Sequence, residues 1–257
     1  MLSAVIVLEV FKELRLIINL SSENGIRLPI HYNSIIQAAI YNSITPELAE
    51  FLHDQGFKYE KRSFKMFSFS RIMGQYDFNN KNKELLFQDK FSLHITSPIN
   101  VFCEELANIM LLSGNVKLGS NIVNVDKVEV VNSQVSSETA YFRTLSPIVV
   151  YSTVFKPNGE KYTCYYQPGD KEFKKQIGGN LQKKFISLFR KKPPLKEIGI
   201  EKKGSIKQNI LIYKGFVIKG YSCTLKVQAP REILQLGLDA GLGAKNSQGF
   251  GCVDILD

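Results

Sequence analysis

The 257-residue sequence has only four cysteines, and none of them forms a Cys-x-x-Cys pair. Cysteines scattered in this way, without a secretory context, are typical of reduced core residues in a cytoplasmic protein, and not of zinc ligands or a disulfide framework. No apolar run reaches the roughly 18–20 residues that a membrane span needs. The apolar stretch at 1–13 is short and interrupted by Glu9, so we interpret it as an N-terminal extension and expect no membrane partner.

Two nucleotide-binding motifs are also missing. A P-loop ends in Gly-Lys followed by Ser or Thr, and the chain contains no such tripeptide. The dinucleotide fingerprint needs a third glycine three residues after the second, but Asn246 stands three residues after Gly243. The sequence has only three histidines and no cluster of carboxylates, histidines or cysteines at metal-ligand spacing. This disfavours a metal-dependent nuclease, and we expect neither a metal nor a cofactor.

Basic residues are in clear excess, with 33 Lys and Arg against 24 Asp and Glu and a net charge of +9. Such an excess favours a polyanionic partner, because neutralising phosphates releases their counterions. Charge alone does not separate a nucleic-acid-binding protein from a soluble protein that is merely basic.

Glycines gather near the end of the chain, where five of the 18 fall within residues 237–251. The spacing is Gly-apolar-Gly, then five residues that include Lys245, then Gly-apolar-Gly. Glycine adopts positive φ easily, and a run of such residues can direct several amides at one anion. We expect a turn shaped by Gly241, Gly243, Gly249 and Gly251, with Lys245 nearest a nucleic-acid phosphate. The alternative is that the loop packs closely on a neighbouring helix.

This glycine pattern resembles the loop of the repeat-associated RNA-binding superfamily (RAMP) of CRISPR systems. Within it, the chain resembles the endoribonuclease that cuts precursor CRISPR RNA, and the segments that carry this resemblance are Leu14–Leu20, Ala39–Ser43, Phe51–Asp54 and Phe142–Ile148. The resemblance covers roughly residues 14–257. It implies that CRISPR repeat RNA is bound and cut once per repeat without a cofactor. Dimers are common among such proteins, and other Cas effector-complex proteins are further candidate partners.

Two alternative functions stay open. The first is a catalytically inactive subunit that holds CRISPR RNA within an effector complex. The second is a general single-strand RNA-binding protein that stacks bases on its sheets, for which Phe67 and Phe69 would supply an aromatic pair.

The hydrophobic pattern predicts an α+β protein with two tandem ferredoxin-like (RRM-like) βαββαβ domains at 14–132 and 138–257, and the resemblance implies the same architecture. Helices are expected at 33–44, 47–53, 98–112, 171–190 and 230–237. Strands are expected at 14–20, 65–71, 87–95, 121–131, 140–154, 198–202, 210–218, 220–227 and 251–256.

RNA can be cut without a metal because its own 2′-hydroxyl is a nucleophile next to the scissile phosphorus. A protein then supplies a base, an acid and a cation, and histidine suits the proton transfers because its ordinary pKa is about 6.5. The resemblance maps these roles onto Tyr41 and His53, which share acid–base work, and onto Lys65, which stabilises the phosphorane. The products would carry 5′-hydroxyl and 2′,3′-cyclic phosphate ends. From the sequence alone, Tyr41 could equally pack in the core, and His53 could simply complement a helix dipole.

Other residues compete for these roles. Lys58 and Lys61 are alternatives to Lys65, because the segment between them can be aligned with a shift. His31, just before the first helix, is the alternative histidine, whereas His94 lies within an expected strand and is interpreted as structural.

The helix expected at 171–190 and the residues just after it carry many basic side chains, and part of this face is predicted to contact the RNA backbone; the alternative is a solvated helix face. The residues predicted to bind RNA are Lys183, Lys184, Lys202, Lys203 and Lys245.

Overall fold

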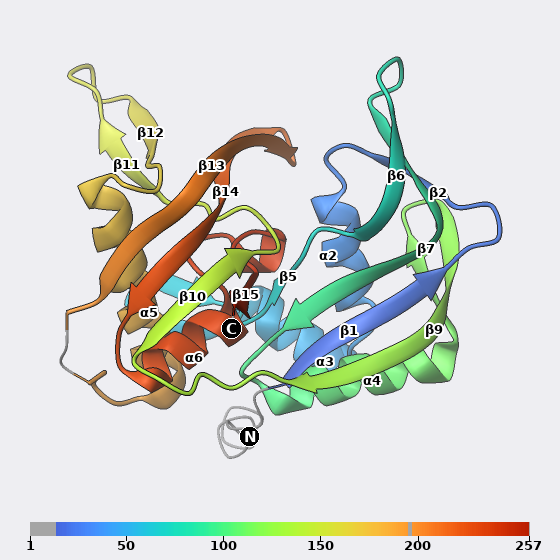
Figure 1. Ribbon diagram of the computed structural model, residues 1–257, viewed down its shortest axis with the longest axis horizontal. Coiled ribbons are helices and arrows are strands. Elements are labelled where there is room, and N and C mark those ends of the chain that lie inside the picture. Colours follow the sequence, from blue (N-terminus) through green and yellow to red (C-terminus); the bar gives the residue numbers. More distant parts are fainter. Residues whose placement is uncertain (1–13, 195–196, 257) are drawn as a thin grey trace.

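The computed structural model describes residues 14–194 and 197–256, so the extension expected at 1–13 lies outside the described part of the chain. Two β-sheets stand side by side, each built from one half of the sequence (Figure 1). Within the described residues, no helix is long and apolar enough to cross a membrane.

The first sheet has the strand order β2-β7-β1-β9-β8. Side chains of its central strand β1 alternate, so that Leu16, Ile18 and Leu20 are all buried under the helices. Helix α4 contacts β1, β8 and β9, and α2 contacts β8. The bounds are β1 Leu14–Ser21, β2 Ile26–Pro29, α2 Asn33–Tyr41, β5 Ser68–Phe69, β6 Met73–Asn79, β7 Glu84–Thr96, α4 Asn100–Ser113, β8 Asn115–Leu118 and β9 Asn121–Asn132.

The second sheet has the order β13-β14-β10-β15, and a separate β11–β12 hairpin projects beyond it (Figure 1). Helices α5 and α6 contact each other, and α6 also contacts β10 and β15. The bounds are β10 Thr139–Thr144, β11 Tyr151–Phe155, β12 Lys161–Tyr165, α5 Lys171–Phe189, β13 Gly199–Tyr213, β14 Phe216–Gln228, α6 Arg231–Ala240 and β15 Val253–Leu256.

Both sheets have the ferredoxin-like connection of strands and helices. In each, the first and third strands of the motif are neighbours in the centre, β1 with β7 and β10 with β14, and the last strand, β9 or β15, lies beside the first. The predicted fold of two tandem βαββαβ domains is therefore confirmed.

Three expected strands were wrong in detail. The segment 140–154 is not one strand, because it is divided between β10 and β11, which belong to different sheets. The segment 210–218 is not one strand, because Lys214 and Gly215 both have positive φ and form the turn between β13 and β14. The segment 65–71 is extended only at Ser68–Phe69, because Met66 has φ of 55° and interrupts the pairing. This break in the strand lies directly beside Lys65.

The two halves share one continuous hydrophobic cluster that runs from β1 to β15. At its edge, the Arg15 guanidinium donates a hydrogen bond to the Val253 carbonyl at 2.7 Å and forms an ion pair with Asp254. The core also contains Phe67 and Phe69, each 1% exposed. These two rings are therefore not available as a base-stacking pair, which removes the feature that favoured a general single-strand RNA-binding protein.

Candidate active site and RNA-binding surface

Tyr41 and His53 meet where two helical segments end. Tyr41 is the last residue of α2, and His53 lies in η1 (Phe51–Gln55), a π-helical turn that continues α3 (Pro46–Glu50). The two rings are edge to face, with centroids 6.2 Å apart. A π turn widens the helix locally and is often found at functional sites.

Lys65 reaches the same place from a third segment. The hairpin of β3 (Phe57–Tyr59) and β4 (Arg62–Phe64) turns back beneath η1, and the Lys65 ammonium donates a hydrogen bond to the His53 carbonyl at 2.6 Å. Gly56 makes this return possible, since it has φ of +59° and a Cβ there would lie 2.6 Å from the Ser63 hydroxyl. The structure thus brings Lys65, not the exposed Lys58 or Lys61, against His53.

The electrostatics of the three groups differ. Burial, and secondarily the Tyr213 phenol, raises the pKa of Tyr41 to about 12, so its hydroxyl keeps its proton at neutral pH. Burial lowers the pKa of Lys65, and the Asp54 carboxylate opposes this. The Asp54 carboxylate lies 2.6 Å from His53 Nδ1. Because a carboxylate only accepts, Nδ1 carries the proton and Nε2 is left as the basic nitrogen. The His53 side chain is 76% exposed and open to a substrate.

The other two histidines lie elsewhere. His31 precedes α2, and its Nδ1 accepts a hydrogen bond from the Ile212 amide at 3.2 Å. Helix α2 rises about 12 Å from Asn33 to Tyr41, which places His31 at the opposite end of the helix from Tyr41. His94 is half-buried on β7, where burial and the Arg15 charge lower its pKa.

The glycine-rich loop (241–251) is folded mainly by contacts within the protein. All four expected glycines have positive φ, and a Cβ at Gly249 would lie 2.5 Å from the Phe69 ring. The loop therefore packs on β5 of the first domain, and not only on a helix. Backbone carbonyl groups of the protein accept hydrogen bonds from the backbone amides of Leu242, Ala244, Gln248, Gly249 and Gly251. The expectation that the loop directs its amides at an anion is therefore wrong for these five.

Helix α2 holds the loop with a polar stripe that sequence reasoning missed. The Asn33 side-chain amide donates to the carbonyls of Gln248 and Gly249 at 2.8 and 3.1 Å, and Gln37 donates to the Ser247 carbonyl at 2.7 Å. Tyr41 is the next residue at the same spacing of four, so it lies on the same face of the helix. The loop and the Tyr41–His53 pair are thus joined by one helix face.

Lys184 is not on the solvent-exposed face of α5. Its side chain is buried, with only 2% exposed, and its ammonium donates to the carbonyls of Ala240 and Gly241 at 3.0 and 2.6 Å and to Asn246 Oδ1 at 2.8 Å. Burial lowers the pKa of Lys184 to about 7. The three acceptors oppose this shift, because they favour the ammonium, which donates three hydrogen bonds, over the neutral amine, which donates only two. The prediction that Lys184 contacts RNA is therefore corrected: it anchors the glycine-rich loop from beneath. The adjacent Lys183 is only half-buried.

The remaining predicted RNA contacts are at least partly exposed. Lys202 and Lys203 are consecutive in β13, so their side chains point to opposite faces of the sheet. Lys203 pairs with Glu201 at 2.8 Å, whereas Lys202 extends near Gly169, just before α5. Lys245 is half-buried, with its ammonium 5.6 Å from the centre of the Tyr151 ring.

Within the described part of the chain, no group of three or more His, Cys, Asp or Glu side chains is arranged to hold a metal ion. The four cysteines form no disulfide within the described part of the chain.

The two tandem ferredoxin-like domains, with the glycine-rich loop of the second packed on the first, have the arrangement expected from the resemblance to the repeat-associated class of CRISPR proteins. Two family models narrow the class: one described as CRISPR-associated protein Cas6, N-terminal, matches residues 27–129, and one described as CRISPR associated protein Cas6, C-terminal, matches residues 129–255. The chain belongs to the Cas6 family, which confirms the resemblance noted in the sequence.

Similar proteins span nearly the whole chain. The CRISPR-associated endoribonuclease Cas6 of Pyrococcus furiosus is 27% identical over 91% of this chain and 85% of its own length. The CRISPR-associated endoribonuclease Cas6 1 of Methanocaldococcus jannaschii is 25% identical over 94% of this chain and 92% of its own. A solved structure described as that of a Cas6-related gene from Pyrococcus furiosus matches with a TM-score of 0.82 and 23% identity, over 95% of this chain and 98% of that one.

Proposed function

We propose that this protein is an endoribonuclease that binds CRISPR repeat RNA and cuts precursor CRISPR RNA once within each repeat, without a metal, by attack of the RNA's own 2′-hydroxyl. The observation that carries the proposal is the convergence of three separate segments on one exposed point. Tyr41 and His53 pack ring against ring there, and the Lys65 ammonium contacts the His53 backbone. The names of the relatives support the same activity.

The roles follow from the protonation of each group. His53 Nε2 takes the proton from the 2′-hydroxyl, and Asp54 steadies the imidazolium that forms. The Tyr41 phenol, which keeps its proton at neutral pH, donates it to the departing 5′-oxygen. Lys65 donates one N–H to the His53 carbonyl and a second, at 3.4 Å, to the Ser63 hydroxyl, and its third N–H and its charge stabilise the negative charge that develops on the phosphorane. The products are a 5′-hydroxyl and a 2′,3′-cyclic phosphate.

RNA binding is assigned to a smaller set of lysines than the sequence indicated. Lys183, Lys202 and Lys245 are the candidates that a backbone phosphate can reach. Lys203 is already paired with Glu201, and Lys184 is buried. Phosphate contacts of this kind give affinity that falls with salt and carry no sequence information.

The test is incubation of the purified protein in EDTA with repeat RNA from a neighbouring array, beside the same RNA carrying a single 2′-deoxy at the cut. We expect one cut in the unmodified RNA and none in the deoxy RNA. His53→Ala should abolish the cut while His31→Ala, the matched histidine control, leaves it. Cleavage that persists in the deoxy RNA, or that requires a divalent cation, would refute the mechanism. Tight, specific binding without any cut would instead identify a subunit that holds CRISPR RNA.

A further inference from the structure

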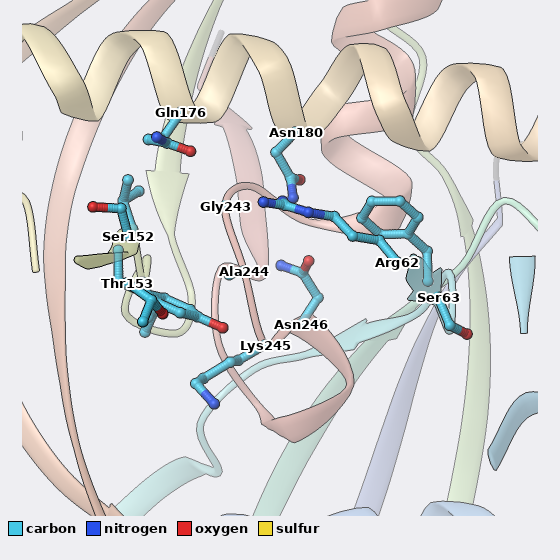
Figure 2. Close-up of a pocket in the computed structure, with 14 residues that line it drawn as sticks. Arg62, Ser63, Ser152, Thr153, Gln176, Asn180, Gly243, Ala244, Lys245 and Asn246 are labelled. Atoms are coloured by element: carbon cyan, nitrogen blue, oxygen red, sulfur yellow. The ribbon is translucent and has the colours of Figure 1, made fainter. Parts of the chain in front are cut away.

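A pocket of about 560 Å³ lies between α5, the start of β11, β4 and the glycine-rich loop. In Figure 2, Gln176 and Asn180 extend from α5 at the top of this α5 pocket, and Arg62 reaches in from β4 on the opposite side to Ser152 and Thr153. The volume falls in the range of about 300–1,000 Å³ that is usual for small-ligand sites. Ser63 lines the pocket, and its hydroxyl is 3.4 Å from the Lys65 ammonium. The α5 pocket therefore adjoins the candidate active site.

The floor of the pocket is rigidly built. The Lys184 ammonium fixes Asn246 Oδ1, and Asn246 Nδ2 donates to the carbonyls of Leu242 and Phe250 at 3.1 and 3.0 Å. The amide of Asn246 is thus saturated by contacts within the protein. It shapes the pocket but has little hydrogen-bonding capacity left for a ligand.

Asn180 is the opposite case. It lies one helical turn before Lys184 on the same face of α5, and it is only 9% exposed. Its Oδ1 is buried and has no hydrogen-bond partner among the described residues. A buried acceptor without a partner is costly and rare. Asn180 lines the pocket, and a half-turn of its amide, which exchanges Oδ1 and Nδ2, would present this oxygen to a ligand that donates a hydrogen bond.

The charges around the pocket narrow the ligand further. Arg62 is exposed at one side, and Lys245 lies at another, over the Tyr151 ring. Two cations favour phosphate groups at the rim, but a phosphodiester has only acceptors and cannot satisfy Asn180 Oδ1. Every nucleobase, in contrast, carries at least one N–H donor on its pairing edge. A nucleotide supplies both parts: phosphates for the cations and a base N–H for the asparagine.

We propose that the α5 pocket receives one unstacked nucleotide of the repeat RNA, whose base donates a hydrogen bond to Asn180 Oδ1 while Arg62 and Lys245 hold the flanking phosphates. The inference rests on the proposed function, because it assumes that repeat RNA is the ligand. It makes Asn180 a specificity-determining residue, since the unstacked nucleotide must lie next to the phosphate that is held at Lys65. Proteins read extruded bases in this way, by hydrogen bonds to the pairing edge inside a closed pocket.

The experiment combines a protein variant with an RNA scan. Repeat RNA made non-cleavable by one 2′-deoxy at the cut is prepared with a single abasic site at each position in turn, and its affinity is measured by fluorescence anisotropy. The proteins are wild type, Asn180→Leu and, as the matched control, Gln182→Leu, which removes an exposed amide from the other side of the same helix. Asn180→Ala is the second variant should leucine not be accommodated.

One abasic position should weaken wild-type binding at least about fivefold, the size of a lost hydrogen bond. The same position should have little further effect on Asn180→Leu, because both changes remove one contact. Asn180→Leu should keep or raise the melting temperature, since it deletes an unpaired buried acceptor, and Gln182→Leu should bind like wild type.

Three results would overturn the inference. The first is that the effects of the Asn180 substitution and of the abasic site on affinity are additive at every position. The second is that the Asn180 substitution is coupled to a 2′-deoxy substitution and not to an abasic site, and the third is a lower melting temperature of the Asn180 variants without coupling to any base. Cleavage of unmodified RNA by the wild type is scored separately. Cleavage without coupling removes the pocket's role and leaves the proposed function standing, whereas a wild type that binds no repeat RNA removes both.

Discussion

Replacing Lys184 by methionine should destabilise the protein, although burying a lysine is itself costly. The substitution keeps the length of the side chain but leaves three oxygen acceptors in and beside the glycine-rich loop without their donor. Each such loss costs about 1–3 kcal/mol. The lower end applies, because methionine also removes the cost of burying an ammonium. We therefore expect a loss of about 3 kcal/mol, or a fall in Tm of about 6–12 °C for a chain of this size.

The assay is thermal unfolding followed by calorimetry at neutral pH, with Lys183→Met as the matched control. Lys183 is the adjacent residue but is partly exposed, so its replacement should change stability by no more than about 0.5 kcal/mol. RNA binding should distinguish the two variants in the opposite way. Lys183→Met should reduce the salt dependence of RNA affinity by about one phosphate contact. A Lys184→Met protein as stable as the wild type would refute the reasoning, because the three hydrogen bonds would then contribute nothing beyond the cost of burying the lysine.

Three further predictions concern the candidate site and the loop. Gly249→Ala should lower stability by about 2 kcal/mol or more, since its φ is +82° and the new methyl meets the Phe69 ring; an unchanged Tm would contradict the packing described. Tyr41→Phe should keep RNA affinity and slow single-turnover cleavage by about 10²–10⁴-fold, and a rate within threefold of wild type would exclude the phenol as the acid. Because burial lowers the pKa of Lys65, cleavage should decline as the pH rises through that lowered value and the ammonium loses its proton. Lys65→Arg, which stays charged, should move this decline to higher pH, and an unmoved decline would assign it to another group.

The main helices and long strands could be predicted because their apolar residues repeat at the spacing of the element. Helix α5 shows both the strength and the limit of this reasoning. Phe173, Ile177, Leu181 and Phe185 predicted its buried face correctly. Lys184 lies seven residues after Ile177 and therefore on that same face, so the spacing alone indicated burial. Its charge indicated a surface position instead, and only the three carbonyl and amide oxygens of the folded loop explain why it is inside.

Other features depend on contacts between distant segments. The apolar run 210–218 looked like one strand because the Lys214–Gly215 turn interrupts it with only two residues, although a glycine between two apolar runs is a hairpin signal. At the candidate site, the resemblance favoured Lys65 but left Lys58 and Lys61 as alternatives. The close return of the β3–β4 hairpin at Gly56 is what brings Lys65 to His53. Asn180 gave no sequence signal, because an unpaired amide is defined by what surrounds it.

Helix α2 has a consequence for where an RNA would be cut. Asn33 at its start holds the glycine-rich loop, and Tyr41 at its end faces His53, so the helix fixes these two points about 12 Å apart. A helix neither stretches nor twists freely, and one residue inserted between them would turn Tyr41 by about 100° away from His53 while Asn33 stayed in place. The helix thus sets a fixed distance between the glycine-rich loop and the candidate active site. Under the proposed function, the distance between the glycine-rich loop and the phosphate that is cut is a length set by one helix of the first domain.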